Sequence, residues 1–291
     1  MPFLINNRRK HFQPEAHEGD WDFAQGDVPS QVTWTQIASG FSENLFAICP
    51  QHNGNGVVAL TTYTNAYLEA GTCTGLALDL YSKTSRANNN GTDLRFGTYA
   101  LCTRDGLKFL LEDKDADTTL CMRTASSAYD LTTLSATNDS SYNPFGNNAD
   151  GEHFEWASIS PDGKHVILAS EDTNNVCRLR SFDLSTAFNL STHTSEKSTS
   201  LSATGAAWVN PNGYQILQAE YASNTSCDIV LYTLRTAWDA SAILKRVVLG
   251  TVTFSGYTSA NGLFTNPDGD KIFIVVATGH YAVVDLSGGG E

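Results

Sequence analysis

The stretch Ser160-Pro161-Asp162-Gly163-Lys164-His165-Val166-Ile167-Leu168-Ala169 decides the fold of this 291-residue chain. Its first half is a Pro-Asp-Gly turn, in which the aspartate side chain caps its own backbone and the glycine takes a positive φ angle. Its second half is a short apolar run, bounded by turn residues, of the kind that forms a buried strand. The stretch therefore predicts a turn that leads into the second strand of a β unit.

The same turn recurs along the chain, so the protein is built from repeats. Gly213 and Gly269 lie in two close copies, and Gly54 and Gly106 lie in two weaker copies nearer the N-terminus. Neighbouring copies of the glycine are about 50 to 57 residues apart, close to the spacing of four-stranded propeller blades.

A second landmark follows each turn and is predicted to end a third strand. It is an Asp-Leu pair or a close variant, and its copies end at Leu80, Leu131, Leu184, Leu234 and Leu286. A fourth strand is predicted between the units, most clearly in residues 246–254. We therefore predict an all-β protein, a β-propeller of five four-stranded blades that occupies residues 31–287.

The last unit ends soon after its third strand, so its fourth strand is expected from elsewhere in the chain. Residues 31–38 alternate between apolar and polar side chains, as a half-buried strand does. We predict that this N-terminal strand completes the last blade, which removes an exposed sheet edge. The alternatives are a six-bladed ring with a degenerate unit within residues 126–150, or an open β-solenoid.

Net charge excludes two classes of partner. The chain carries a formal charge of −13, and its only local excess of basic residues near the N-terminus is Arg8, Arg9 and Lys10. An acidic body is repelled by nucleic acid and by anionic membranes. The first residues do not resemble a secretory signal, so we expect synthesis in a cytoplasm and no insertion into a membrane.

Residues 1–30 form an N-terminal arm that combines basic and apolar side chains, and residues 288–291 form a short C-terminal tail. We predict that the arm docks onto another protein or onto its own domain, with a solvated tail as the alternative. The docking candidates are Phe3, Leu4, Ile5, Arg8, Arg9, Lys10, Phe12, Trp21 and Phe23.

The sequence offers little support for chemistry. Its cysteines follow the repeat and are predicted to be buried free thiols, and no spacing of Cys and His suits a metal. Motifs for nucleophilic or phosphate chemistry are absent from the sequence. We therefore predict no catalytic residue, no cofactor and no metal ligand. Glu112, Glu171 and Glu220 follow second strands and are predicted to line a solvated acidic rim, with a cation or sugar site as the alternative.

Residues 182–192 and 232–242 resemble the Y-x-L-S-T-A-W-D-x-S-T-A repeats of propeller proteins from tailed bacteriophages. The resemblance implies a location in the virion, other virion proteins as partners, and no catalytic residue. Our first hypothesis is a non-enzymatic structural component attached to the head, neck or tail by its arm, and self-association stays open.

Two further hypotheses remain. One is a module that binds a host surface glycan, and the other is a glycan-cleaving enzyme, since five-bladed propellers host such activities. The tryptophans are alternatively expected to fill the interfaces between blades. The candidate glycan-binding residues are Trp156, Trp208, Trp238, Glu112 and Glu220.

Overall fold

A computed structural model describes residues 35–36, 45–50, 56–61, 67–74, 77–79, 85–88 and most of residues 100–285. The gaps in the last range are 104, 113–118, 129, 136, 147–151, 195, 224, 255–259, 266–270 and 277–279. The predicted arm, residues 1–30, and the predicted tail, residues 288–291, lie outside the described residues. All nine docking candidates in the arm therefore remain predictions.

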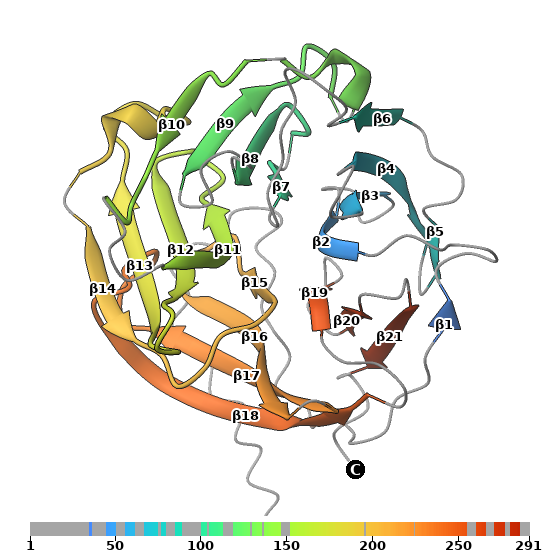
Figure 1. The fold of residues 1–291 in the computed structure, drawn as a ribbon, viewed down its shortest axis with the longest axis vertical. Coiled ribbons are helices and arrows are strands. Elements are labelled where there is room, and N and C mark those ends of the chain that lie inside the picture. The colour runs from blue at the N-terminus through green and yellow to red at the C-terminus, as the bar shows by residue number, and fades with distance from the viewer. Residues whose placement is uncertain are drawn as a thin grey trace, which may run out of the picture.

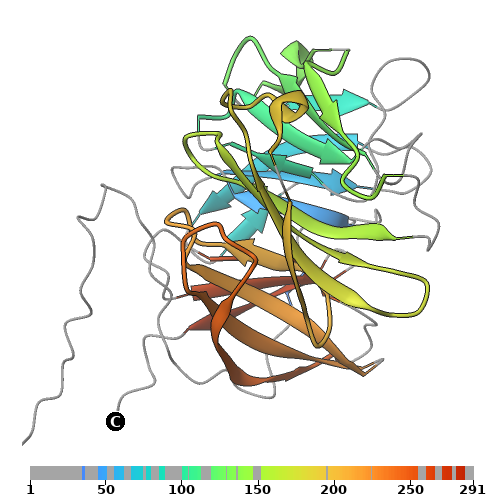
Figure 2. The same cartoon turned by 90° about the vertical axis from the view of Figure 1, so that its left-hand side faces the viewer.

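The described chain is all-β, and its antiparallel sheets stand in a ring, the arrangement of a β-propeller (Figure 1). Four of the sheets have four strands each, and one has five. Seen from the side, the sheets are layered face to face around the ring (Figure 2). This confirms the predicted all-β propeller arrangement.

The first two sheets along the chain contain nine strands. One sheet comprises β2 (Leu45–Pro50), β3 (Gly56–Thr61), β4 (Tyr67–Thr74), β5 (Ala77–Asp79) and β6 (Ser85–Asn88). The next comprises β7 (Ala100–Cys102), β8 (Lys108–Glu112), β9 (Leu120–Thr124) and β10 (Ser140–Tyr142), with the 3-10 turn η1 (Leu131–Thr133) before β10.

The remaining sheets follow the predicted repeat closely. The third comprises β11 (His153–Ile159), β12 (His165–Glu171), β13 (Cys177–Asp183) and β14 (Lys197–Ser200), with η2 (Leu190–Thr192) before β14. The fourth comprises β15 (Ala207–Val209), β16 (Gln215–Ser223), β17 (Ser226–Leu234) and β18 (Ile243–Thr253). The last comprises β19 (Ala260–Thr265), β20 (Lys271–Val276), β21 (His280–Asp285) and β1 (Thr35–Gln36).

The last sheet also meets the first, which closes the ring. β19 contacts both β15 and β2, and β2 in turn contacts β7. The units therefore do not form the open solenoid that the sequence left as an alternative. The degenerate extra unit proposed within residues 126–150 is not found in its described part, where η1 and β10 instead complete the sheet that begins at β7.

The predicted pairing of the N-terminal strand with the last sheet is present. β1 runs antiparallel to β21, with Thr35 opposite Tyr281 and Gln36 opposite His280. Two residues of the predicted strand are described, so the pairing is observed at that point. The N-terminal and C-terminal parts of the domain thus share one sheet.

Two of the predicted landmarks are wrong. Leu80 follows β5, which is the fourth strand of its sheet and not the third. β5 pairs with residues 72–74 of β4, and β6 pairs with residues 67–70 along the same edge of β4. This shared edge explains why the sheet has five strands instead of the predicted four. Leu131 begins η1, because β9 already ends at Thr124. The true counterpart of Leu184 is Ala125: both form an isolated bridge to the residue after the 3-10 turn.

The Pro-Asp-Gly turns are built as predicted wherever they are described. Gly163 and Gly213 have φ angles of 71° and 75°, and Asp162 Oδ1 accepts a hydrogen bond from the Lys164 amide (3.0 Å). The hydrophobic core lies between the sheets, where side chains of β12 pack against those of β8 and β9 on one face and β16 and β17 on the other. Four cysteines in the described residues are buried and free, as predicted: Cys102, Cys121, Cys177 and Cys227.

Candidate functional site

In the third and fourth sheets, the segment after the third strand folds back onto the glycine turn of its own sheet. Phe188 and Trp238 both adopt a φ angle of 59°, and their amides donate to the carbonyl oxygens of Gly163 (2.8 Å) and Gly213 (2.9 Å). Each aromatic ring then covers its glycine so closely that no side chain fits at the glycine position. The turn and the aromatic residue therefore form a single unit, which we call the turn lock.

The residues after each turn lock attach to the preceding sheet. The buried Leu190 amide donates to Ser140 Oγ on β10 (3.0 Å), and the buried Ala240 amide donates to Ser181 Oγ on β13 (2.9 Å). The two contacts join different pairs of sheets in the same way. A recurring backbone-to-serine bond thus links neighbouring repeats, and we call it the serine latch.

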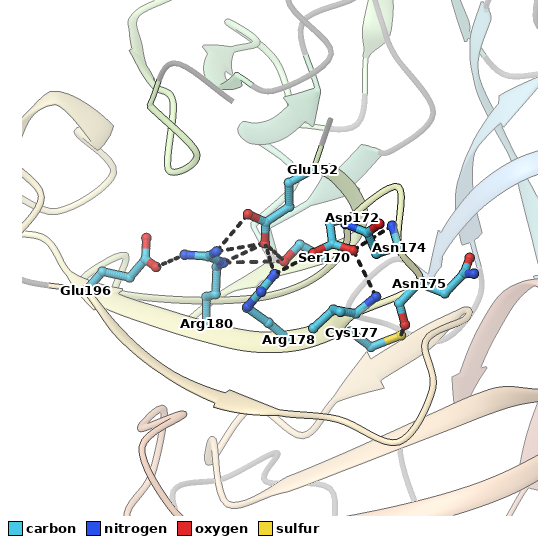
Figure 3. Close-up of polar contacts among 10 residues, drawn as sticks. Glu152, Ser170, Asp172, Asn174, Asn175, Cys177, Arg178, Arg180 and Glu196 are labelled. Atoms are coloured by element: carbon cyan, nitrogen blue, oxygen red, sulfur yellow. Dashed lines mark hydrogen bonds and ion pairs between the residues drawn. The ribbon is translucent and has the colours of Figure 1, made fainter. Parts of the chain in front are cut away.

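A cluster of charged residues lies on the face of β12 and β13 that looks toward β10, and Figure 3 shows its contacts. Glu152, just before β11, accepts from Arg180 Nη2 at both carboxylate oxygens (2.7 and 2.8 Å). The Ser170 hydroxyl adds a third hydrogen bond to Glu152 Oε1 (2.6 Å). Glu196 accepts from Arg180 Nη1, and the Phe145 ring centroid lies 5.5 Å from the guanidinium carbon. We call this set the Glu152 cluster.

The loop at the end of β12 extends the cluster. Asp172 Oδ1 accepts from the amides of Asn174 (2.8 Å) and Val176 (3.0 Å), and Asp172 Oδ2 accepts from Arg178 Nη1 (3.3 Å). The amides of Val176 and Asn174 and the Arg178 guanidinium together outweigh burial and hold the pKa of Asp172 below its ordinary value. Asp172 thus fixes a four-residue turn between β12 and β13.

A second cluster occupies the next interface, on the face of β16–β18 that looks toward β13. Glu220 accepts from the Tyr232 hydroxyl and from Arg246 Nη2, the latter at 2.5 Å. The Ser202 hydroxyl, from the segment after β14, donates to Glu220 Oε2 (3.3 Å). We call this set the Glu220 cluster.

Burial and hydrogen bonds shift the pKa values of groups in both clusters. Burial and the hydrogen bond to Glu220 both raise the pKa of Tyr232 above its ordinary value. The hydrogen bond to Glu220 likewise raises the pKa of Arg246. In the Glu152 cluster, burial raises the pKa of Glu196 although Arg180 opposes this. Arg180 and Arg178 lie beside the Glu152 carboxylate, and Arg246 lies beside that of Glu220.

The structure buries two of the three tryptophans that were glycan-binding candidates. Trp156 and Trp238 are 2% and 8% exposed and lie in one apolar cluster between the sheets β11–β14 and β15–β18. A ring enclosed between two sheets cannot stack on a sugar, so the alternative expectation, that these residues fill an interface, is confirmed for both. Trp208 on β15 is only partly buried.

The predicted solvated acidic rim is wrong. Glu112 and Glu220 are 3% and 4% exposed, and Glu220 lies within β16, where Tyr232 and Arg246 of its own sheet bind it. Glu171 is partly exposed and accepts from the Thr204 hydroxyl (2.7 Å). The two candidate glutamates are therefore buried and do not line the surface.

Sequence reasoning missed Glu152, Arg180 and Arg246 as site residues. Arg180 and Arg246 lie within strands, near the further basic residues Arg178 and Lys245, and a charged residue inside a strand is the signal that was available. A charged residue in such a place needs a buried partner, since an unpaired buried charge is costly.

The arrangement is suited to holding the strands of one sheet together, because both central carboxylates accept several hydrogen bonds from arginine and hydroxyl groups of that sheet. Among the described residues, no group of three or more His, Cys, Asp and Glu side chains is placed to hold a metal ion. No helix in that part of the chain is long and apolar enough to cross a bilayer. The sequence matches no model of a known protein family and no curated protein.

Proposed function

We propose that this protein is a non-enzymatic structural component of a tailed-phage particle, held on the head, neck or tail by residues 1–30. One observation carries the proposal. The two segments that resemble phage propeller repeats, residues 182–192 and 232–242, make the same turn lock and the same serine latch in two successive sheets. The resembling segments therefore include residues that make matching contacts in the two sheets.

We further propose that the sheets are the blades of a closed five-bladed propeller, with β1 as the fourth strand of the last blade. The five sheets of the described chain and the contacts of β19 with β2 support this count. A closed ring is suited to a part that must keep its shape within an assembly.

Polar residues inside the ring support a structural role for the body. Glu152 and Glu220 bind arginines of their own sheets, and the serine latches bind backbone amides of the next repeat. Buried polar groups of this kind contribute specificity to packing when every partner is satisfied.

The arm is the proposed attachment point because its composition differs from that of the body. Arg8, Arg9 and Lys10 lie among apolar residues, in a chain whose formal charge is −13. A basic and apolar segment suits a partner with an acidic surface and an apolar groove. Other proteins of the particle are the proposed partners.

Incorporation into particles tests the proposal. Purified particles of the source phage should contain the protein, and complementation with a variant that lacks residues 1–30 should give particles that lack it. The matched control is Arg8→Gln, Arg9→Gln, Lys10→Gln, which keeps the arm and removes its charge. Particles that carry the truncated protein at the normal level would contradict arm docking, and particles without the full-length protein would contradict a virion role.

A host glycan as ligand is the second candidate, and the partial exposure of Trp208 is the observation that favours it. Binding of the purified protein to a glycan array, abolished by Trp208→Ala and unchanged by Tyr221→Ala, would favour this role. Release of sugar from a host polysaccharide would contradict the non-enzymatic proposal.

A further inference from the structure

The turn of the fourth sheet contains Asn212 followed by Gly213, whereas the turn of the third sheet contains Asp162 followed by Gly163. An asparagine before a glycine is especially prone to spontaneous deamidation, because glycine has no side chain to hinder attack by its own backbone nitrogen. The sequence thus places a reactive pair inside a turn lock. Whether this pair reacts depends on how the turn holds it.

Deamidation at this pair is an intramolecular reaction. The Gly213 nitrogen loses its proton to solvent and attacks the side-chain carbon Cγ of Asn212. A nitrogen–carbon bond forms, the bond from Cγ to Nδ2 breaks, and ammonia leaves behind a five-membered succinimide ring. Water then opens the ring at either of its carbonyl carbons. One opening gives aspartate, and the other gives isoaspartate, in which the backbone runs through the former side chain.

The folded turn keeps the Gly213 nitrogen away from Cγ of Asn212. The Gly213 amide donates to the Asn210 carbonyl oxygen (2.7 Å), which closes a four-residue turn, and Asn210 Oδ1 accepts from the Asn212 amide (3.1 Å). Asn212 lacks the positive φ angle of a type II turn, so the turn is type I and the ψ angle of Asn212 is about 0°. At that angle the Gly213 nitrogen is turned away from the side of Cβ, and the ring does not close.

The Asn212 side chain is itself held in place. Its Oδ1 atom accepts from the Tyr214 amide (2.9 Å), in the same way that Asp162 Oδ1 accepts from the Lys164 amide (3.0 Å). Rotation of the side chain toward the Gly213 nitrogen breaks the bond to Tyr214. Both partners of the reaction are therefore fixed in positions from which they do not react.

The turn lock opposes the rearrangement that the reaction requires. The Trp238 amide donates to the Gly213 carbonyl oxygen (2.9 Å), and the indole ring lies where a side chain at Gly213 would be. Trp238 is 8% exposed and lies between two sheets. A change in the ψ angle of Asn212 rotates the peptide group that joins it to Gly213, and this motion displaces the buried ring. The reaction therefore requires the lock to open first.

We propose that Asn212 is a deamidation site whose reactivity is controlled by the turn lock. The pair is unreactive while Trp238 covers Gly213, and it reacts after the ring has left. Control of this kind follows from local opening, since a reaction that needs an open segment proceeds in proportion to the population of that segment. The inference does not depend on the proposed virion role.

The two products have different consequences for the fold. Aspartate is accommodated at this position, because Asp162 makes the same contact in the third sheet. Isoaspartate adds a further backbone carbon before Gly213, so the glycine no longer lies under the indole ring of Trp238. The lock then does not reform, and opening becomes irreversible in the molecules that carry isoaspartate.

Ageing of the full-length chain in a mildly alkaline buffer, followed by peptide mass spectrometry, tests the control by the lock. Asn-Gly pairs also occur elsewhere in the chain, so each peptide is measured separately. We expect Asn212 to react about 100-fold more slowly in the folded protein than in guanidinium chloride, because the open turn is then rare. Equal rates in the two states would overturn control by the fold, and absence of reaction in guanidinium chloride would overturn Asn212 as a site.

Ring variants separate the lock from overall stability. Trp238→Ala should accelerate the reaction at Asn212 in native buffer by about tenfold or more. Trp238→Phe, which supplies the ring that Phe188 provides in the third sheet, should react more slowly than Trp238→Ala. Phe188→Ala is the matched control, because it opens the other lock, and it should leave the rate at Asn212 unchanged. Equal acceleration by Phe188→Ala and Trp238→Ala would show that general loosening controls the reaction, and would overturn the proposal.

Refolding separates the two products. Protein aged in guanidinium chloride is returned to native buffer and divided by limited proteolysis into resistant and sensitive fractions, and isoaspartate at position 212 is measured in each. We expect aspartate in the resistant fraction and isoaspartate in the sensitive one, and Asn212→Asp should unfold at the same urea concentration as the wild type. The same ratio of the two products in both fractions would overturn the loss of the lock.

Discussion

The indole ring of Trp238 occupies the space where a side chain at Gly213 would lie. A methyl group on Gly213 would be 2.0 Å from Cδ1 of that ring, and the corresponding distance from Gly163 to Cε2 of Phe188 is 2.4 Å. Both glycines also have positive φ angles, which side chains disfavour. The glycine of each turn is thus required by the aromatic residue that follows it by 25 positions.

Substitution of Gly213 by alanine should therefore destabilise the protein more than backbone strain alone explains. Gly146 has a φ angle of 60° and nothing within 4 Å of an added methyl group, so Gly146→Ala isolates the cost of the backbone conformation. That cost is about 1–2 kcal/mol. We expect Gly213→Ala to lower the free energy of unfolding by clearly more, measured by urea denaturation. Equal losses in the two variants would show that the indole moves away freely.

Removal of the ring itself should be costly for a different reason. Trp238→Ala deletes a buried side chain between two sheets and should lower the free energy of unfolding by about 3–5 kcal/mol. Tyr221→Ala, on an exposed residue of β16, is the matched control and should change it by less than about 0.5 kcal/mol.

The Glu152–Arg180 pair should be destabilised most when only one partner is removed. Arg180→Met leaves the buried Glu152 carboxylate without its nearest cation and should cost about 3 kcal/mol. The double variant Glu152→Gln, Arg180→Met should recover part of this loss, because the charge of Glu152 is then removed as well. Denaturation of the wild type, both single variants and the double variant gives the coupling energy, and a sum of single effects equal to the double effect would contradict the predicted coupling.

The serine latches should each contribute about 1–3 kcal/mol, since removal of the hydroxyl leaves a buried amide without an acceptor. Ser181→Ala removes the acceptor of the Ala240 amide. Ser185→Ala, on an exposed residue of the following turn, removes a hydroxyl of the same kind at the surface. Equal stability of these two variants in urea would contradict a structural role for the latch.

Alkaline pH should destabilise the protein through Tyr232. Its pKa is raised in the folded state, so the unfolded chain releases this proton first as the pH rises. The contribution is fully present below the ordinary pKa of tyrosine, about 10, and is lost as the pH rises from there through the folded value. Unfolding free energies measured at pH 9 and above should fall less steeply in Tyr232→Phe than in the wild type. Identical slopes would contradict the prediction.

The sequence predicted the parts of the fold that local chemistry determines. Turns such as Asp162-Gly163 and apolar strands such as β12 were located because their residues leave few other conformations. The pairing of β1 with β21 was predicted because an unfinished last unit needs a strand. The landmark at Leu131 misled because an Asp-Leu pair caps a 3-10 turn as readily as it ends a strand.

The candidate site was harder to predict, because its contacts join distant parts of the chain. Glu220 was expected to follow a second strand, as a surface residue would, but it lies within β16, and its partner Arg246 comes 26 positions later, on the outer strand. Whether a strand end is covered depends on how closely the next sheet packs, and periodicity within one strand carries no information about that distance.

The pairing of β1 with β21 also sets the order of events during synthesis. The ribosome delivers Thr35 and Gln36 long before their partners His280 and Tyr281. Intermediate repeats can collapse as they appear, whereas the ring stays a curved, unfinished arc until β21 arrives. A nascent chain of this protein therefore needs protection from neighbours on the same message until His280 and Tyr281 have left the ribosome.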